Sequence, residues 1–179
     1  MELFYNKAMK NQLKQTLADS VRNFHLPRYQ ELPSIGLYLE QTVKYINHCL
    51  EPLGYVEITG SMVRNYVKQG LVANPKNKHY DADQIGYLLC ITILKQAISL
   101  SYIGCLFDRA REVYSNRVAY DYFCSELENV LQYRFGLTDS LADIGVTSSV
   151  EKELLRSGVT AVSNMIYINT CFRYLYPEQ

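Results

Sequence analysis

Four basic side chains and no acidic one lie between Thr59 and Tyr80. The four are Arg64, Lys68, Lys76 and Lys78. Ammonium and guanidinium groups bind phosphate oxygens, and a group of them without neighbouring carboxylates favours a negatively charged partner. The stretch therefore predicts a surface for nucleic acid, although a basic face by itself is also typical of an ordinary solvated surface.

The same stretch suggests a role for each polar side chain. If residues 59–69 form a helix, Arg64 and Lys68 lie one turn apart on it and reach phosphates or guanine edges. Ser61 and Asn65 are further candidates for reading bases, and the two later lysines contact the phosphate backbone. The predicted contacts to double-stranded DNA are Ser61, Arg64, Asn65, Lys68, Lys76 and Lys78.

Local signals place the first four of these residues on a short helix. Thr59 is a good N-cap because its hydroxyl can accept a hydrogen bond from a first-turn amide. Gly70 is typical of the residue that follows a helix end. Val63, Tyr66 and Val67 form one apolar face, which leaves the polar residues for the outer side.

Residues 71–80 are predicted to form a small hairpin, or wing. Residues 71 and 72 begin its first arm, and residues 78–80 form its second. Turn-forming residues lie between the arms: Asn74, Pro75 and Asn77.

Apolar residues at helical spacing predict the remaining elements. The expected helices cover residues 7–22, 36–50, 81–97, 99–110, 115–133 and 148–176. Asp81 and Ser99 are the predicted N-caps of two of them. The first helix carries a stripe of Met9, Leu13, Leu17 and Val21. Because strand signal is confined to the wing, the predicted fold class is all-α with a small β-hairpin.

Composition limits the functional classes. The 179 residues include 18 basic and 18 acidic side chains, which argues against a polybasic binder. The charge is uneven, because residues 1–111 carry 13 basic and 9 acidic groups and residues 112–179 carry 5 and 9. Five cysteines without a CxxC pair favour a reducing, cytoplasmic compartment. The N-terminus lacks a signal peptide pattern, and no apolar run reaches membrane-spanning length, so no membrane association is expected.

No motif indicates an enzyme, a cofactor or a metal site. His25, His48 and His79 are far apart in the sequence, and no phosphate-binding glycine loop or Ser-His-Asp order is present. Asp81 and Asp83 are explained by the start of a helix, where negative charge is favourable. Cys124 has the alternative role of a thiol sensor, but we interpret it as structural.

The segment TGSMVRNYVKQGLV resembles the second helix of MerR-type regulators. The family's order of a capping hydroxyl, Arg, Tyr, a basic residue, Gly and Leu is met by Thr59, Arg64, Tyr66, Lys68, Gly70 and Leu71. Lys78, Tyr80, Asp81 and Asp83 resemble the residues at the end of the family's wing. Ser99 and Leu100 resemble the start of its next helix pair. The resemblance covers about residues 36–107. It implies a winged helix-turn-helix whose second helix enters the major groove.

The chain departs from that family in several places. The turn before Thr59 is longer, the wing is shorter, and Asn65 and Val67 stand where an aromatic and an acidic residue are usual. The C-terminal third has no sustained heptad pattern. Cys124 and Cys171 have no partners at metal-ligand spacing, so the resemblance is not extended to metal sensing.

A second resemblance rests on the words LPRY (26–29), ELPSIGLYLEQ (31–41) and ITGSMVRNYVKQGLV (58–72). They are similar to a family of uncharacterised proteins from Gram-positive bacteria known as domain of unknown function 1836. The resemblance extends over the whole chain and implies a MerR-like fold.

The sequence therefore predicts three segments: an N-terminal helix and connector (1–35), a MerR-like winged helix-turn-helix (36–111), and a C-terminal helical region for dimerisation or sensing (112–179). The expected function is DNA-binding transcriptional regulation by a homodimer that reads half-sites about 34 Å apart, or a multiple of that. Tyrosines of the last two helices are candidates for lining a small-molecule effector pocket. The alternative is a non-enzymatic protein–protein interaction module whose basic wing meets an acidic protein.

Overall fold

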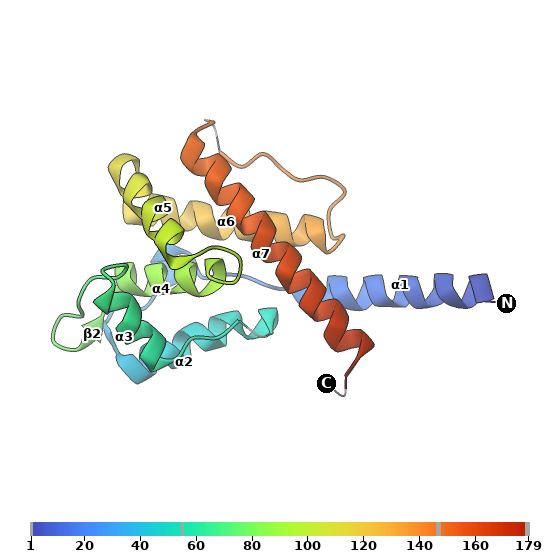
Figure 1. Cartoon of the computed structure of the whole chain (residues 1–179), viewed down its shortest axis with the longest axis horizontal. Helices are drawn as coiled ribbons and strands as arrows, with labels where there is room; N and C mark the ends of the chain where they lie inside the picture. Colours follow the sequence, from blue (N-terminus) through green and yellow to red (C-terminus); the bar gives the residue numbers. More distant parts are fainter. Residues whose placement is uncertain (1, 55, 146–147, 178–179) are drawn as a thin grey trace.

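The computed structural model describes residues 2–54, 56–145 and 148–177, and it describes side chains from residue 10 onwards. This part of the chain is mostly helical, with one two-stranded antiparallel sheet (Figure 1), so the predicted class is confirmed. The elements are α1 (Glu2–Val21), η1 (Tyr29–Glu31), β1 (Leu37–Tyr38), α2 (Leu39–Leu50), η2 (Glu51–Leu53), α3 (Gly60–Lys68), β2 (His79–Tyr80), α4 (Ala82–Leu94), α5 (Leu100–Val113), α6 (Asn116–Arg134) and α7 (Val150–Leu175).

The central element is α4. Residues 84–86 and 88–94 are all buried, because the helix carries no charged side chain after Asp83. A helix that is apolar on all sides must be covered on all sides. Helix α2 and strand β2 pack against it, as do α5, α6 and α7. One apolar core results, and its members extend from Leu17 to Ile166.

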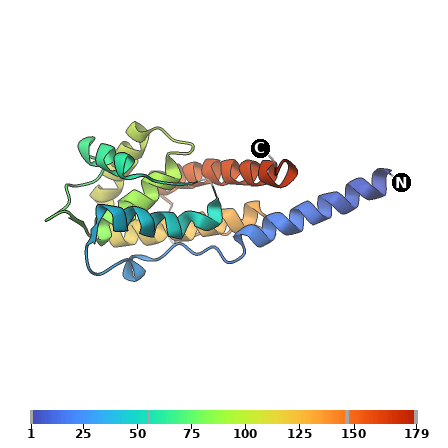
Figure 2. The same ribbon diagram turned by 90° about the horizontal axis from the view of Figure 1, so that it is seen from below.

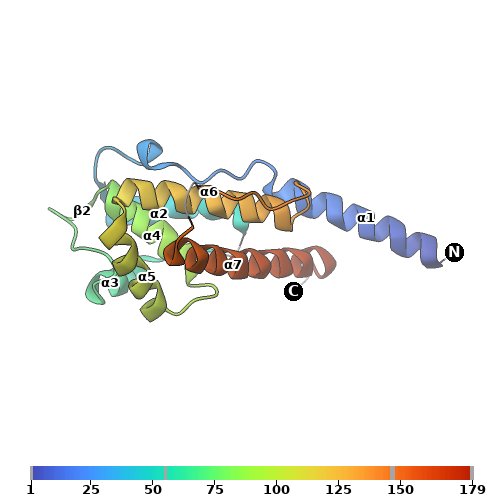
Figure 3. The same ribbon diagram turned by 90° about the horizontal axis from the view of Figure 1, so that it is seen from above.

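Helices α6 and α7 pack along each other, whereas α1 projects beyond the body of the molecule (Figures 2 and 3). The α6–α7 contact contains a buried charge, since Glu126 is fully buried and accepts a 2.5 Å hydrogen bond from Nε of Arg156. Pairing offsets the cost of desolvating that carboxylate. The predicted apolar stripe of α1 buries Leu17 and Val21 and half-buries Leu13; its first member, Met9, lies outside the described side chains.

The connector between α1 and α2 is held against α6. The Leu26 amide and the Arg28 guanidinium both donate to the Glu128 carboxylate, at 2.9 Å and 2.6–2.8 Å. The Tyr120 hydroxyl donates to the Pro27 carbonyl at 2.8 Å. The Tyr29 amide donates to the carboxylate of another α6 residue, at 2.7 Å. These bonds satisfy the backbone groups of a segment that has no regular partner of its own.

The predicted wing differs from the observed one. Strand β2 pairs with β1, in the register Leu37 with Tyr80 and Tyr38 with His79, and not with residues 71–72. Those two residues are buried but not extended into a strand. Pro75 has no amide hydrogen for a ladder, and the Ala73 carbonyl accepts a bond from the Gln84 side chain instead. The hairpin is therefore reduced to a single bridge between Lys76 and His79.

The predicted caps and the glycine stop are confirmed, whereas α1 begins at Glu2 and not at residue 7, and α2 begins at Leu39, after β1, and not at residue 36. Thr59, Asp81 and Ser99 each accept a hydrogen bond from the third residue of their helix. After α3, Gly70 has a φ of +75°, and the Leu71 amide donates to the Tyr66 carbonyl at 3.0 Å. This is the arrangement in which glycine closes a helix without a side-chain penalty. Helix α4 ends at Leu94, three residues earlier than predicted.

Among the described residues, no helix has both the length and the apolar character that a membrane span requires.

The connector contact leads to a stability prediction. We expect Glu128→Ala to lower the free energy of unfolding by about 2–3 kcal/mol, because it leaves the Leu26 amide and the Arg28 guanidinium without an acceptor. The matched control is Glu112→Ala, at an exposed carboxylate, which we expect to change the free energy by less than about 0.5 kcal/mol. Urea denaturation followed by circular dichroism measures both. Equal effects of the two changes would contradict the role given to Glu128.

Candidate nucleic-acid interface

Helix α3 lies at one end of the molecule, far from the N-terminus of α1 (Figure 1). Val63 and Tyr66 are buried, so the helix can rest on the core in only one orientation. As predicted, the polar residues then lie outside. Exposed on α3 are Ser61, Arg64, Asn65 and Lys68.

The start of α3 is fixed by a clamp from α2. The Asn47 side chain donates to the Ile58 carbonyl at 3.0 Å and accepts from the Ile58 amide at 2.9 Å. Val56 and Ile58 are both buried, which anchors the long connection between the helices. The Thr59 cap follows directly. A longer connection than a tight helix-turn-helix turn thus still leads to a defined helix start.

The turn before β2 carries the other two predicted contacts. Lys76 and Lys78 are exposed, and Lys76 and His79 exchange two backbone hydrogen bonds of 2.9 and 3.1 Å. Between them, Asn77 and Lys78 have φ angles of 50° and 66°. Two positive φ angles in a two-residue turn are the geometry for which Asn-Gly is preferred. Lysine in the second position carries a backbone cost, and such outliers gather at functional sites.

The cations of this face have no polar partner. Among the described residues, no hydrogen bond or ion pair reaches the side chain of Arg64, Lys68, Lys76 or Lys78. Every other arginine forms a hydrogen bond or an ion pair through its side chain. In the chain order of the arginines, the partners are Asp19, Glu128, Glu151, Asp108, Asp121, Asn164, Glu126 and Thr170. Burial raises the pKa of Tyr80 in β2, and the positive charge of Arg64 partly opposes that rise. Arg64 therefore lies near β2. The charges of this face are therefore available to a partner.

Two aromatic residues of the same end were not predicted. The pairing of β1 with β2 brings the Tyr38 ring to 4.1 Å from the His79 ring, and Tyr38 is 52% exposed. Both lie beside the turn that carries the two lysines. Nothing local in the sequence indicates this pair, since strand register joins two segments that are 41 residues apart.

One carboxylate borders the basic face. Glu40, in the first turn of α2, lies beside Gly60: a Cβ atom placed on Gly60 would be 3.7 Å from Oε1 of Glu40 and 3.7 Å from Nη1 of Arg64. No acidic residue lies between Thr59 and Tyr80 in the sequence, but the fold brings the Glu40 carboxylate beside this surface.

Two of the thiols, Cys90 and Cys124, are buried, and no metal-binding cluster forms in the described part of the chain. Cys124 is fully buried, and burial raises its pKa to about 12, so the thiol is protonated and unreactive at neutral pH. Burial also raises the pKa of Cys90. No group of three His, Cys, Asp or Glu side chains in the ranges 10–54, 56–145 and 148–177 lies close enough to hold a metal ion.

The sequence model of one family, described as Domain of unknown function (DUF1836), matches residues 27–123, which is more than half of the chain. The match begins in the connector, includes α2 to α5 and ends within α6, so it is narrower than the whole-chain resemblance that we expected. It contains all six predicted contact residues. No curated protein and no solved structure matches the chain.

The turn geometry predicts an unusual gain in stability. We expect Lys78→Gly to raise the free energy of unfolding by about 0.5–1 kcal/mol, because relief of the left-handed backbone outweighs the extra entropy of glycine in the unfolded chain. Lys78→Ala removes the same charge but keeps the strain, and it should be close to neutral. Thermal and urea unfolding of both variants test this. A destabilised Lys78→Gly protein would contradict the strain argument.

Proposed function

The chain belongs to the family described as Domain of unknown function (DUF1836), and we propose that it is a transcriptional regulator that binds double-stranded DNA. The observation that carries the proposal is the set of exposed cations without polar partners on α3 and on the turn before β2. On this proposal the arrangement is a MerR-like winged helix-turn-helix, with α2 and α3 as its two helices and the turn of residues 76–79 as a minimal wing.

The proposal gives α3 the role of the recognition helix. An α-helix with its side chains is about 10–12 Å wide, and the major groove is about 12 Å wide, so an exposed helix face can enter it. With Val63 and Tyr66 directed to the core, Arg64 and Lys68 reach phosphates or guanine edges. Ser61 and Asn65 supply the shorter polar groups for base contacts.

The turn gives the proposal independent support. A glycine at position 78 would remove the backbone cost, yet the chain carries lysine there. Strained residues gather at functional sites, so lysine at this position suggests a use for its side chain. Contact of Lys78 with a phosphate provides that use, and Lys76 extends the same contact along the backbone.

The last helix supports assembly as a homodimer. Four large apolar side chains on α7 are 40–58% exposed, and they follow the 3-4-3 spacing of a helix-pairing seam. They are Met165, Ile168, Phe172 and Leu175. An exposed apolar stripe on a helix favours a partner, and a two-fold dimer would present two copies of α3 to two half-sites.

One observation favours the alternative function. Glu40 beside Arg64 repels phosphate, whereas a protein partner with charges of both signs would pair with both residues. An adaptor that docks a mainly acidic protein surface, with a basic group opposite Glu40, is therefore the second candidate. DNA binding and its salt dependence distinguish the two.

The DNA proposal predicts a steep salt dependence. With four phosphate contacts per subunit, the slope of log affinity against log salt should be about −3.6 per subunit for random-sequence duplex DNA. Arg64→Ala with Lys78→Ala should make that slope shallower by about 1.8 per subunit. Fluorescence anisotropy over a salt series measures both.

The matched control removes two exposed lysines from α1, Lys10→Ala with Lys14→Ala, and so changes the net charge equally. It should leave the slope unchanged. If both double variants lose affinity equally, net charge and not this face governs binding. If wild-type protein shows weak binding with a flat slope, the regulator proposal fails and a pull-down of protein partners tests the adaptor.

The dimer proposal predicts a local effect of charge on α7. Phe172→Glu should raise the dimer dissociation constant at least tenfold, because it places a carboxylate in an apolar seam. Val113→Glu is the control, since it adds the same charge at an exposed apolar residue of α5. Sedimentation equilibrium compares the two variants. Wild-type protein that remains monomeric at micromolar concentration would overturn the proposal.

A further inference from the structure

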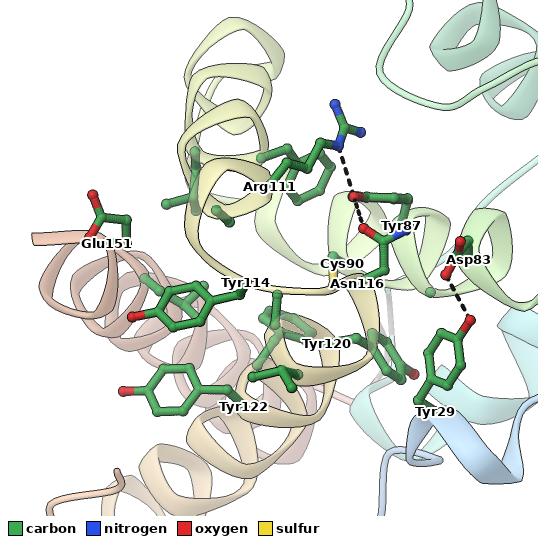
Figure 4. Close-up of a pocket in the computed structure, with 18 of the residues that line it drawn as sticks. Tyr29, Asp83, Tyr87, Cys90, Arg111, Tyr114, Asn116, Tyr120, Tyr122 and Glu151 are labelled. Carbon is green, nitrogen blue, oxygen red and sulfur yellow. Dashed lines mark hydrogen bonds between the residues drawn. The ribbon is translucent and has the colours of Figure 1, made fainter. Parts of the chain in front are cut away.

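A cavity of about 190 Å³ lies where α4 and α5 meet α6 and the N-terminal half of α7 (Figure 4). Its walls include Tyr87 and Cys90 from α4, Phe107 from α5, Phe123 from α6 and Leu155 from α7. The sequence placed an effector pocket between the last two helices alone. The structure instead shows a space that joins those helices to α4 and α5.

The cavity is lined mainly by aromatic and aliphatic side chains, with seven Tyr and Phe residues among them. Several polar groups at its edge already satisfy one another. The Tyr87 hydroxyl donates to Oδ1 of Asn116 at 2.7 Å and accepts from Nε of Arg111 at 2.8 Å, and the Tyr29 hydroxyl donates to Asp83 at 2.8 Å (Figure 4). The walls therefore offer mostly apolar contact.

One donor at the edge is available. Oδ1 of Asn116 is engaged by Tyr87, whereas no described group accepts from its Nδ2 amide. Asn116 lines the cavity. A bound molecule can therefore place one oxygen at Nδ2 while the rest of its surface contacts aromatic and aliphatic side chains.

The volume limits the size of that molecule. An apolar cavity of about 150 Å³ holds one benzene ring, whereas sites for drug-sized ligands measure about 300–1,000 Å³. At about 190 Å³ the space suits one ring with a small substituent. The cavity therefore fits a single-ring phenol or a similarly small apolar alcohol.

Helix α4 connects the cavity to the basic face. Asp83, Gly86, Tyr87, Cys90 and Leu94 face the cavity, at the spacing of one side of a helix. Other buried residues of α4 face away from it, and α4 packs against α2 and β2. Because α4 begins two residues after β2, a shift of the helix also moves the turn that carries Lys76 and Lys78.

We infer that this cavity is a binding site for a single-ring phenolic or comparably small apolar molecule, and that its occupation changes the affinity for DNA. The second part rests on the proposed function; the first does not. Coupling of this kind is reciprocal, so DNA must change the affinity for the small molecule by the same factor.

The first experiment uses p-cresol as the probe and methyl NMR of the full chain. Saturable shifts are expected at Leu94, Leu106 and Leu155, which line the cavity, and not at Leu53, which is buried elsewhere in the core. Because this measurement uses wild-type protein, it does not depend on whether a variant folds. Absence of saturable shifts at the three cavity residues would overturn the inference.

Variants then test the location. Ala119→Leu and Ala110→Leu fill the cavity from α6 and α5, and each should weaken p-cresol binding at least tenfold. Ala161→Leu is the control, at an exposed position of α7 outside the cavity. Unchanged affinity in a cavity-filling variant with a native circular dichroism spectrum would contradict the assignment.

The second experiment repeats the DNA anisotropy titration at one salt concentration with saturating p-cresol. At least a threefold change in the dissociation constant is expected, and Ala119→Leu should abolish the response. Saturable p-cresol binding with unchanged DNA affinity would overturn the coupling alone. Saturable p-cresol binding without any DNA binding would overturn the proposed function and leave the small-molecule site in place.

Discussion

The fold depends on the need to cover α4. This helix carries no charged side chain after Asp83 and is apolar over most of its surface, and burial of each large apolar side chain contributes about 1.5–3 kcal/mol. No single neighbour can cover it, so α2, α5, α6 and α7 pack around it together with β2. Each surrounding helix needs only one apolar face, and α3, which packs on α2, likewise keeps its outer face free to carry charge. The core and the candidate interface are two results of the same constraint.

Local signals were sufficient to predict much of this arrangement. The caps at Thr59, Asp81 and Ser99 and the stop at Gly70 act within one helical turn, so the sequence alone locates those helix ends. The outward direction of Arg64 and Lys68 follows in the same way from Val63 and Tyr66. Six helices and the short α3 were therefore expected at close to their observed positions. These interactions involve residues that are near neighbours in the chain, and sequence patterns record them directly.

Contacts between distant segments were not predictable by these means. The pairing of β1 with β2 sets Tyr38 against His79, and it replaces the wing that the turn residues indicated. Glu40 comes close to Arg64 only because α2 and α3 pack together. The cavity at the junction of α4, α5, α6 and α7 depends on how four helices meet, and no single helix pattern contains that information. The positive φ of Lys78 is likewise set by the two bonds between Lys76 and His79.

The connector held by Glu128 also bears on how the chain reaches its fold during synthesis. Leu26 and its acceptor are 102 residues apart in the sequence. At a translation rate of about 5–20 residues per second, α6 follows the connector by roughly 5–20 s. Throughout that interval the connector has no α6 surface to dock on, and among its main neighbours in the folded protein α1 can contact only η2. Docking of the connector on α6 is thus a late event of synthesis, although the connector is among the first segments to be made.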